Sequence, residues 1–393
     1  MPELVSRLEL ALADLAVDRA DVGSEISYEL RGDRAGAELL VNDERVQRFT
    51  RVGSAVDHLV GAINQGVLDT SPDTLNLHAA AVADATGNAL LLPGVSGAGK
   101  TTLCAALVGA GLAYMSDEMI GVEPVDLTLL GYPKGLTVKA GGRDLLGHHV
   151  DLRPCSMGDG TEARWYVPAG ALGDGGVRTT SSACAVVFAR RLQGAEPSLD
   201  AISRPESVLR LLLNTFDLGR FGPGGVELLA RLVSQCHCAM ATYDEADAVV
   251  PLVSGLLHDA VDPVEVVPLA AHGPSGRPAT VSTDASSSAE HRDGVVGIAF
   301  PDGGVLYDPA TGRALLLDRI GVAVWPILDG HTSIGELADE LAGHFDAGAE
   351  EIRGDLLSLC HQLAESGFLA GIEATVDPPD WRKALAALDA PRR

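Results

Sequence analysis

The chain has 393 residues, of which 46% are hydrophobic, so it is long enough for two or three domains with ordinary buried cores. Its formal net charge of −25 argues against a nucleic-acid partner and against binding to an anionic membrane surface, because both are bound through the positive charges of Lys and Arg. No stretch approaches the roughly 20 consecutive apolar residues of a membrane span, and the amino terminus lacks a basic segment followed by an apolar one. We therefore expect a cytoplasmic protein.

Residues 1–77 carry helix and strand patterns but no obvious chemistry. Apolar residues have helical spacing at 4–15 and 56–67, and strand-like runs occur at 25–30 and 38–42. We expect this segment to be an α+β extension that covers or extends the sheet of the domain that follows.

The most informative motif follows an apolar run at 88–92. Residues 93–102 read PGVSGAGKTT and fit the pattern G-x-x-x-x-G-K-[ST] at every fixed position. In this pattern the glycines bring backbone N–H groups close to phosphate oxygens, Lys100 places a charge at the β- and γ-phosphates, and Thr101 offers a hydroxyl to Mg²⁺. A glycine-rich turn that binds nothing would not need Lys and Thr at those places. We predict an ATP and Mg²⁺ site formed by Gly94, Val95, Ser96, Gly97, Ala98, Gly99, Lys100, Thr101 and Thr102.

Polar residues flank this motif on both sides in the sequence. His78 interrupts an apolar strand pattern at 75–82, where it lies either near the phosphates or as a hydrogen-bonded core histidine. Asp117 and Glu118 end the strand pattern that follows the helix of the motif. Because strand–helix–strand units are normally parallel, we expect this strand end beside the loop. Asp117 could then hold Mg²⁺ or take a proton from a hydroxyl, unless both acids simply cap the strand in water.

The next turn, at 131–135, leads into a strand pattern and brings two lysines into an acidic protein. Lys134 and Lys139 could offset phosphate charge or be solvated side chains. Another strand, at 183–191, is apolar enough to be central and ends in Arg190 and Arg191.

The carboxy-terminal part is separated from the motif-bearing part by a change in composition. We predict a P-loop domain at 78–260, a flexible linker at 261–294 rich in Pro, Ser, Gly and Ala, a compact unit at 295–371 and a tail at 372–393. Three short strands and three helices are expected in the compact unit, which has the helix pattern of a winged helix. Its last helix carries too few cations to bind DNA, which favours a protein or peptide partner. A small sheet with an open edge can bind an extended peptide as an additional strand.

Residues 78–258 resemble the HPr kinase/phosphorylase family. The resemblance rests on Leu77-His78-Ala79-Ala80, the P-loop, Asp117-Glu118, and the turn at 132–136. It implies that Asp117 acts as base on a serine hydroxyl, that Thr101 holds Mg²⁺, and that His78 lies near the transferred phosphate. Our candidate catalytic residues are Asp117, Lys100, His78 and Glu118, and our candidate metal ligands are Thr101 and Asp117. The sequence departs from the family in having Glu118 where a second aspartate is usual, and in lacking the family's Arg-Gly-Leu-Gly loop. Related kinases suggest a homo-oligomer.

Residues 295–371 resemble the PqqD family, which binds the leader peptides of ribosomally made natural products. The matching residues are Tyr307-Asp308-Pro309, Leu316-Leu317-Asp318, Trp325, Leu328-Asp329-Gly330 and Gly367-Phe368-Leu369. The resemblance implies that a leader lies as a strand against the third strand and the third helix. The residues concerned here are Ala314, Leu315, Leu316, Leu317, Leu356, Leu359 and Leu363, although some of the helix leucines could be core residues.

The expected fold is thus an α/β P-loop kinase core joined to a small α+β winged-helix-type domain. The expected function is an ATP- and Mg²⁺-dependent peptide kinase that phosphorylates a Ser or Thr of a precursor peptide, plausibly of the lasso type. Two alternatives remain: an NTP-hydrolysing switch or scaffold that presents the peptide to another enzyme, and a kinase for a small metabolite or a carrier protein.

Overall fold

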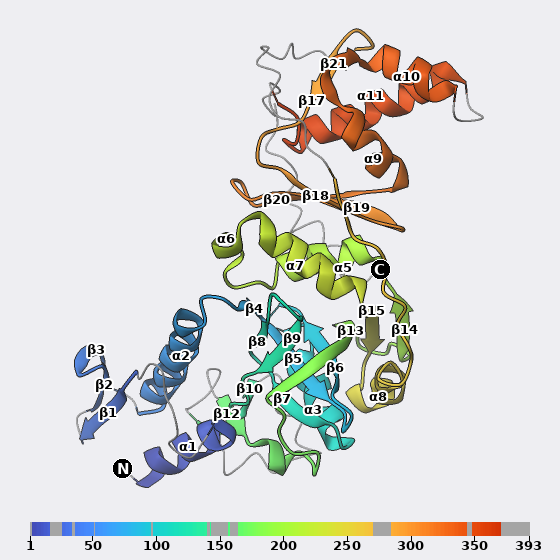
Figure 1. The fold of residues 1–393 in the computed structure, drawn as a ribbon. Helices are drawn as coiled ribbons and strands as arrows, with labels where there is room; N and C mark the ends of the chain where they lie inside the picture. The colour runs from blue at the N-terminus through green and yellow to red at the C-terminus, as the bar shows by residue number, and fades with distance from the viewer. Residues whose placement is uncertain are drawn as a thin grey trace. The chain divides into compact units, whose positions relative to one another are not determined.

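The computed structural model describes residues 2–15, 26–33, 36–50, 52–95, 97–139, 142, 156–157, 164–269, 284–343 and 348–370 (Figure 1). Ser96 of the predicted loop and the predicted tail at 372–393 lie outside these residues. The chain forms two compact units. The first consists of Met1–Ala201, Asn214–Phe216 and Ala239–Val261, and the second of Ile202–Leu213, Asp217–Cys238 and Asp262–Arg393.

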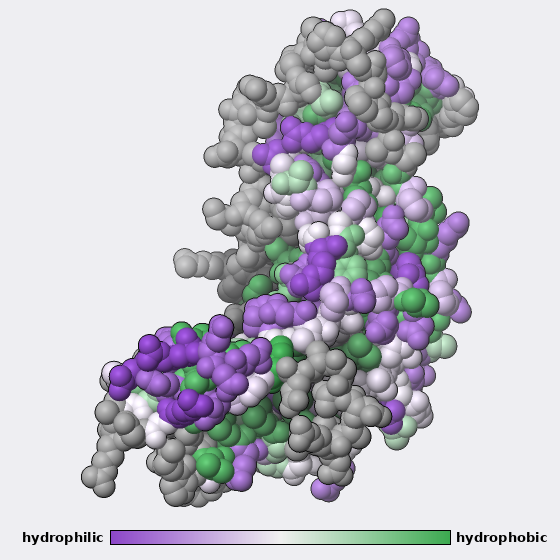
Figure 2. All heavy atoms as spheres, turned by 60° about the vertical axis from the view of Figure 1, so that its left-hand side comes forward, coloured by the Kyte–Doolittle hydropathy of each residue, from purple (hydrophilic) through white to green (hydrophobic). Residues whose placement is uncertain are grey.

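The amino-terminal part of the first unit is a small antiparallel sheet with two helices, as the sequence patterns predict. Its elements are α1 (Pro2–Leu12), a 3-10 turn (Ala13–Leu15), β1 (Tyr28–Asp33), β2 (Gly36–Val41), β3 (Glu44–Phe49) and α2 (Val52–Thr70). Strand β3 has no apolar alternation and was not predicted; five of its six residues are exposed. This side of the molecule is rich in hydrophilic side chains (Figure 2).

A nine-stranded sheet forms the centre of the first unit, in the order β4-β8-β9-β13-β6-β5-β7; β15 also pairs with β13, and β14 pairs with β15. The strands are β4 (Leu75–Leu77), β5 (Ala79–Ala83), β6 (Asn88–Pro93), β7 (Ala113–Ser116), β8 (Ile120–Val122), β9 (Thr128–Gly131), β13 (Thr180–Arg191), β14 (Ser198–Ala201) and β15 (His237–Tyr243). Strand β13 runs parallel to β6 and is central, as its apolar sequence predicts. Helix α3 (Lys100–Gly109) packs against β5, β6 and β13, and α8 (Ala246–Gly255) packs against α3 (Figure 1).

Three strand ends meet at one edge of this sheet, and they position the candidate site. Strand β5 lies between β6 and β7 and is antiparallel to both, so β6 and β7 run in the same direction without being neighbours. In the register, Ala79 at the start of β5 pairs with Pro93 at the end of β6, and Ser116 at the end of β7 pairs with Ala81. Strands β6 and β7 are therefore parallel, as predicted, but β5 is inserted between them.

The strand predicted at 75–82 is divided in two at His78. Strand β4 pairs with β8, whereas β5 pairs with β6 and β7. At the break, the backbone N–H of His78 donates a hydrogen bond to the carbonyl of Asn214 at 2.6 Å. His78 is consequently a junction residue between two strands rather than a residue within one.

A second small sheet closes the other side of α3. It consists of β10 (Leu136–Lys139), β12 (Arg164–Val167) and β11 (Ser156–Met157), all antiparallel. Apolar residues of β10 and β12 join α3 in one core cluster, which includes Leu136, Val138, Trp165 and Val167. Because α3 is covered by sheet on more than one side, all its residues from Leu103 to Val108 are buried.

The second unit contains a four-stranded antiparallel sheet in the order β16-β18-β19-β20. Its elements are β16 (Val267–Leu269), β17 (Ser288–Glu290), β18 (Val296–Phe300), β19 (Gly303–Asp308), β20 (Arg313–Leu317), α9 (Arg319–Val324), a 3-10 turn (Trp325–Ile327), β21 (Asp329–Ser333), α10 (Ile334–Ala342) and α11 (Ala349–Glu365). The three predicted strands and three predicted helices are confirmed. Ser333 and Glu336 form the reciprocal capping box at the start of α10. Trp325 is fully buried in the core beneath α10 and α11.

Three helices from earlier in the chain also belong to the second unit. They are α5 (Arg204–Leu212), α6 (Leu218–Phe221) and α7 (Pro223–Ser234). Helix α5 packs against β19 and β20, and α7 against β18, on the face away from α9, α10 and α11 (Figure 1). The physical reason is visible in β19, where Val305 and Leu306 point to opposite faces and are both fully buried.

The predicted division of the chain therefore needs correction. Helices α5 and α7 were expected in the domain at 78–260, and strands β16 and β17 lie within the segment expected to be a linker at 261–294. A sheet with two apolar faces has to be covered twice, and the helices of 202–238 supply the second cover. Among the described helices, none is both long and apolar enough to cross a membrane.

Candidate functional site

A cavity of about 520 Å³ lies in the first unit, at the edge where β5, β6 and β7 come together. It brings together residues from five separate parts of the sequence. Its lining consists of His78, Gly97, Gly99, Lys100, Thr101, Thr102, Asp117, Glu118, Thr137, Val138, Lys139, Gly142 and Arg191. The predicted catalytic residues are all in this wall. Of the predicted loop residues, Gly94, Val95 and Ala98 are described but do not line the cavity.

The loop between β6 and α3 has the backbone that its glycines predict. Gly99 has a φ of 102°, and a Cβ at this position would stand 2.5 Å from the hydroxyl oxygen of Tyr243. That hydroxyl donates a hydrogen bond to the carbonyl of Gly99 at 3.2 Å. Gly99 directly precedes the first residue of α3. Both its positive φ and the close approach of Tyr243 require a residue without a side chain here.

Lys100 is folded back onto its own loop. Its Nζ donates to the carbonyl oxygen of Gly94 and, at 3.3 Å, to that of Val95. Burial lowers the pKa of Lys100 to about 8, against the opposing effect of Glu118 and Asp117 and with a smaller lowering by Lys139. The Lys100 side chain is thus held at its own loop, in the wall of the cavity.

His78 lies in the wall of the cavity with 29% of its side chain exposed. Burial, followed by the charges of Lys100 and Lys139, lowers the pKa of His78 to about 4. Its Nε2 is 4.0 Å from Oε1 of Glu118, which is too long for a hydrogen bond. Because an imidazole with this pKa is neutral at pH 7, we regard the two groups as neighbours rather than as an ion pair.

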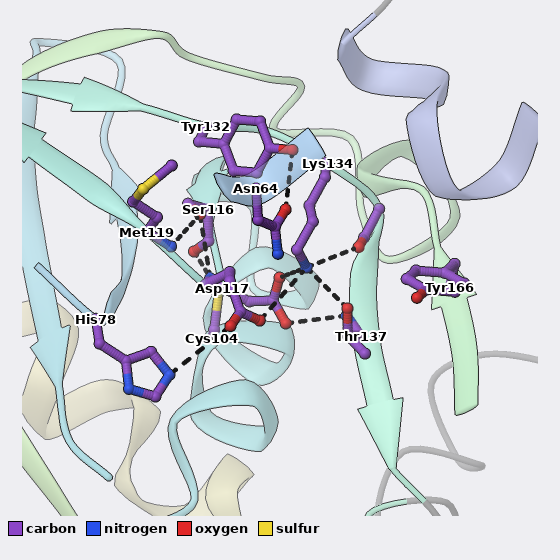
Figure 3. A network of polar contacts seen from close by, with 12 residues as sticks. Asn64, His78, Cys104, Ser116, Asp117, Met119, Tyr132, Lys134, Thr137 and Tyr166 are labelled. Atoms are coloured by element: carbon purple, nitrogen blue, oxygen red, sulfur yellow. Dashed lines mark hydrogen bonds and ion pairs between the residues drawn. The ribbon is translucent and has the colours of Figure 1, made fainter. Parts of the chain in front are cut away.

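Asp117 is the centre of a buried polar network (Figure 3). Its Oδ1 accepts from Lys134 Nζ at 2.9 Å and from the Tyr114 hydroxyl at 3.0 Å, and its Oδ2 accepts from the backbone N–H of Thr137 at 2.9 Å. The side chains of Asp117 and Lys134 are 2% and 1% exposed. Asp117 does not cap its strand in water, as one alternative held; it is a fixed carboxylate.

The two lysines of the 131–139 segment have different environments. Lys134 is buried against Asp117, whereas Lys139 is exposed and lines the cavity. Arg191, at the end of β13, also lines the cavity and is held by the carbonyl and the carboxylate of Asp244 at 2.9 and 3.2 Å. The sequence offers a signal for the buried lysine, namely a single charge within the otherwise uncharged stretch 127–138.

The residues of the cavity fit a magnesium ion that also has phosphate ligands. Thr101 and the carboxylate of Asp117 supply hard oxygen ligands, and Mg²⁺ in such sites typically takes one or two carboxylates and completes its shell with phosphates and water. Nowhere among the described residues do three or more His, Cys, Asp or Glu side chains gather as a metal site. A magnesium ion here would therefore depend on the nucleotide for part of its shell.

The predicted peptide-binding residues of the second unit differ in burial. On β20, Ala314 and Leu317 are buried, and Leu315 and Leu316 are partly buried. On α11, Leu356 and Leu363 are core residues with 3% and 1% exposure, as the alternative interpretation allowed, and Leu359 is partly buried. Strand β20 is the last strand of its sheet in the part of the chain that the structure describes.

Comparison with known proteins identifies part of the second unit. Residues 303–369 match the family model described as coenzyme PQQ synthesis protein D (PqqD). A stretch of 60 residues, which is 15% of the chain, is 37% identical to the PqqA binding protein of Bradyrhizobium diazoefficiens (strain JCM 10833 / BCRC 13528 / IAM 13628 / NBRC 14792 / USDA 110). The chain spans 58% of the length of that relative. The chain therefore has a PqqD domain in its carboxy-terminal part, within a mixed α/β structure.

Proposed function

We propose that the protein is an ATP- and Mg²⁺-dependent kinase that phosphorylates a Ser or Thr hydroxyl of a ribosomally made precursor peptide, whose leader is bound by the PqqD domain. The observation that carries the proposal is the cavity of the first unit. There the P-loop residues Lys100 and Thr101, a neutral histidine and two carboxylates face the same space.

The donor half of the site would be the loop and its cations. Loop amides and the N-terminal end of α3 favour phosphate oxygens, and Lys100 would transfer its hydrogen bonds from Gly94 and Val95 to the triphosphate. Lys139 and Arg191 add positive charge to the wall of the cavity in an otherwise acidic protein. Thr101 and Asp117 would hold a bound Mg²⁺, which would supply positive charge against the phosphates.

The acceptor half would be delivered by the second unit. The relative is named for binding PqqA, and we carry a peptide-binding role over to this PqqD domain. The outer edge of β20 can receive an extended leader as an additional antiparallel strand, with Leu315, Leu316 and the partly buried Leu359 as apolar contacts. Binding the leader raises the local concentration of the segment to be phosphorylated.

The mass of a precursor peptide after incubation with ATP and Mg²⁺ tests the proposal. We expect a gain of one phosphate, abolished by Lys100→Ala. Consumption of ATP with unchanged peptide mass would refute the kinase and favour the NTP-dependent switch. Phosphorylation that is equally fast for a peptide lacking its leader would remove the PqqD domain from the reaction and favour an acceptor of another kind.

A further inference from the structure

The contacts of Asp117 leave little of its carboxylate available. A carboxylate has about four acceptor positions in its plane, two on each oxygen. Oδ1 faces Lys134 Nζ and the Tyr114 hydroxyl, and Oδ2 accepts from the backbone of Thr137. The Tyr114 hydroxyl has a second acceptor, the carbonyl of Lys134 at 2.9 Å, but in either orientation it fills the space beside Oδ1. One position remains, on Oδ2.

Lys134 fixes this arrangement from behind. Its Nζ donates to Asp117 Oδ1 and to Thr137 Oγ1, at 2.9 and 2.7 Å, and both of those residues line the cavity while Lys134 does not. With 1% exposure, the ammonium group of Lys134 would be an uncompensated buried charge without Asp117. The carboxylate of Asp117 would likewise be an uncompensated buried charge without Lys134. These contacts hold the Asp117 carboxylate in one orientation, with Oδ1 directed toward Lys134 (Figure 3).

The carboxylate of Glu118 is much less constrained than that of Asp117. The Glu118 side chain is 36% exposed and lines the cavity. Two neighbouring nitrogen atoms, Lys134 Nζ at 3.9 Å and His78 Nε2 at 4.0 Å, lie beyond hydrogen-bond distance of its carboxylate. The hydroxyl of Ser116 accepts from the backbone N–H groups of Glu118 and Met119, both at 3.1 Å, which fixes the turn after β7. The backbone of Glu118 is thus held while its carboxylate has room for a ligand.

We propose that the two carboxylates divide the work: Asp117 is the fixed metal ligand, Glu118 receives the proton of the acceptor hydroxyl, and Lys134 is the positioning residue that enforces the division. A single open position on Asp117 cannot serve the metal and the hydroxyl together. This inference rests on the proposed kinase function and departs from the role that family resemblance implies for Asp117.

Transfer to a hydroxyl acceptor forms one bond to phosphorus and breaks another. A bond forms between the acceptor oxygen and the γ-phosphorus of ATP, and the bond from that phosphorus to the β,γ-bridging oxygen breaks, with its electron pair remaining on ADP. The hydroxyl proton passes to an oxygen of Glu118 and from there to solvent.

Two variants, Asp117→Asn and Glu118→Gln, test the division through two measurements. Binding of Mn²⁺, as a paramagnetic substitute for Mg²⁺, is measured with ADP by the electron paramagnetic resonance of free Mn²⁺. The kcat of peptide phosphorylation is measured separately. We expect Glu118→Gln to bind Mn²⁺ within about twofold of the wild type and to lose about 100-fold or more in kcat. We expect Asp117→Asn to lose about 10-fold or more in Mn²⁺ affinity.

Equal losses of Mn²⁺ affinity in the two variants, or a Glu118→Gln kcat within threefold of the wild type, would overturn the division. If the wild type transferred no phosphate to peptide, the proposed function would fail. The Mn²⁺ measurement would still decide the metal assignment, because loss in Asp117→Asn alone supports it and equal loss contradicts it.

Lys134→Arg tests the positioning role, since it keeps the charge but replaces the compact ammonium group. We expect a folded protein by circular dichroism whose Mn²⁺ affinity falls about tenfold, the size typical of partners that orient a metal ligand. Should Lys134→Arg misfold, the variant Lys134→Met/Asp117→Asn removes both buried charges, and we expect it to fold and bind Mn²⁺ no better than Asp117→Asn. Wild-type Mn²⁺ affinity in Lys134→Arg would remove Lys134 from this role, and wild-type Mn²⁺ affinity in the double variant would remove Asp117 as the metal ligand.

Discussion

Replacement of Gly99 by alanine gives the most direct test of the loop geometry. The backbone of Gly99 has a φ of 102°, which disfavours an L-residue by about 1–2 kcal/mol. The new Cβ would in addition stand 2.5 Å from the Tyr243 hydroxyl, and forced overpacking of this kind costs about 1–3 kcal/mol. We therefore expect Gly99→Ala to lower the free energy of unfolding of the first unit by about 2–5 kcal/mol, the sum of the two.

The chain offers a matched control in Gly97, which lies in the same loop. Its φ is 92°, but a Cβ there would meet nothing within 4 Å. Gly97→Ala should therefore cost only the conformational part, about 1–2 kcal/mol. The free energies come from urea denaturation, with ATP affinity measured on the same samples.

Tyr243→Phe completes the experiment because it removes the oxygen that the new Cβ would meet. Alone it should cost about 0.5–1.5 kcal/mol, the value of its hydrogen bond to the carbonyl of Gly99. Combined with Gly99→Ala it should restore about 1–3 kcal/mol relative to the additive expectation. Additive costs in the double variant, or a Gly99→Ala no worse than Gly97→Ala, would refute the close approach of Tyr243 to the loop.

Four further outcomes are expected. His78 has a folded-state pKa of about 4, below its usual value of 6.5, so protonation favours the unfolded chain. The free energy of unfolding should therefore fall as the pH drops from about 6.5 toward 4, and it should fall by less in His78→Gln. Identical pH profiles of the two proteins would contradict the assignment. Trp325→Ala should destabilise the second unit by about 3–5 kcal/mol in calorimetry, since Trp325 is fully buried and stacked on His291 with ring centroids 3.9 Å apart. On α11, Leu359→Glu should weaken binding of a fluorescent leader peptide in anisotropy titrations, whereas Ser358→Glu, at the neighbouring exposed position, should not; equal affinities would exclude this helix face. Deletion of residues 262–393 should give an aggregating protein by light scattering, because it uncovers the apolar faces of α5 and α7, and a monodisperse product would show that these helices do not need the sheet.

Local signals predicted the parts of the fold whose residues are close in sequence. The loop from Gly94 to Thr102, with the strand before it and the helix after it, follows from a short motif, and the three strands at 296–317 follow from turn residues at regular intervals. Likewise, the capping box of Ser333 and Glu336 needs only a spacing of three residues.

Contacts between segments that are far apart in the sequence could not be predicted from local signals. Nothing near β5 in the sequence indicates that it is inserted between β6 and β7, and nothing near α5 indicates that its apolar face is matched by a sheet about 100 residues later. The pairing of Lys134 with Asp117 depends on the same long-range geometry, since the carboxylate that the lysine meets stands directly after β7 and not in its own turn. Patterns therefore identified the catalytic candidates that line the cavity but not Thr137, Val138 and Gly142, nor the contacts that distinguish Asp117 from Glu118.

The order in which the two units occur along the chain has a consequence for how the protein can be altered. The chain passes from one unit to the other at 201/202, 213/214, 216/217, 238/239 and 261/262. A module attached at one end could be exchanged by a single recombination event, but here every exchange of the whole second unit would have to preserve all of these junctions. Changes in what the second unit binds are therefore accessible through point substitutions on β20 and α11, and transplantation of residues 303–369 alone would have to keep the surface of the sheet that faces α5 and α7.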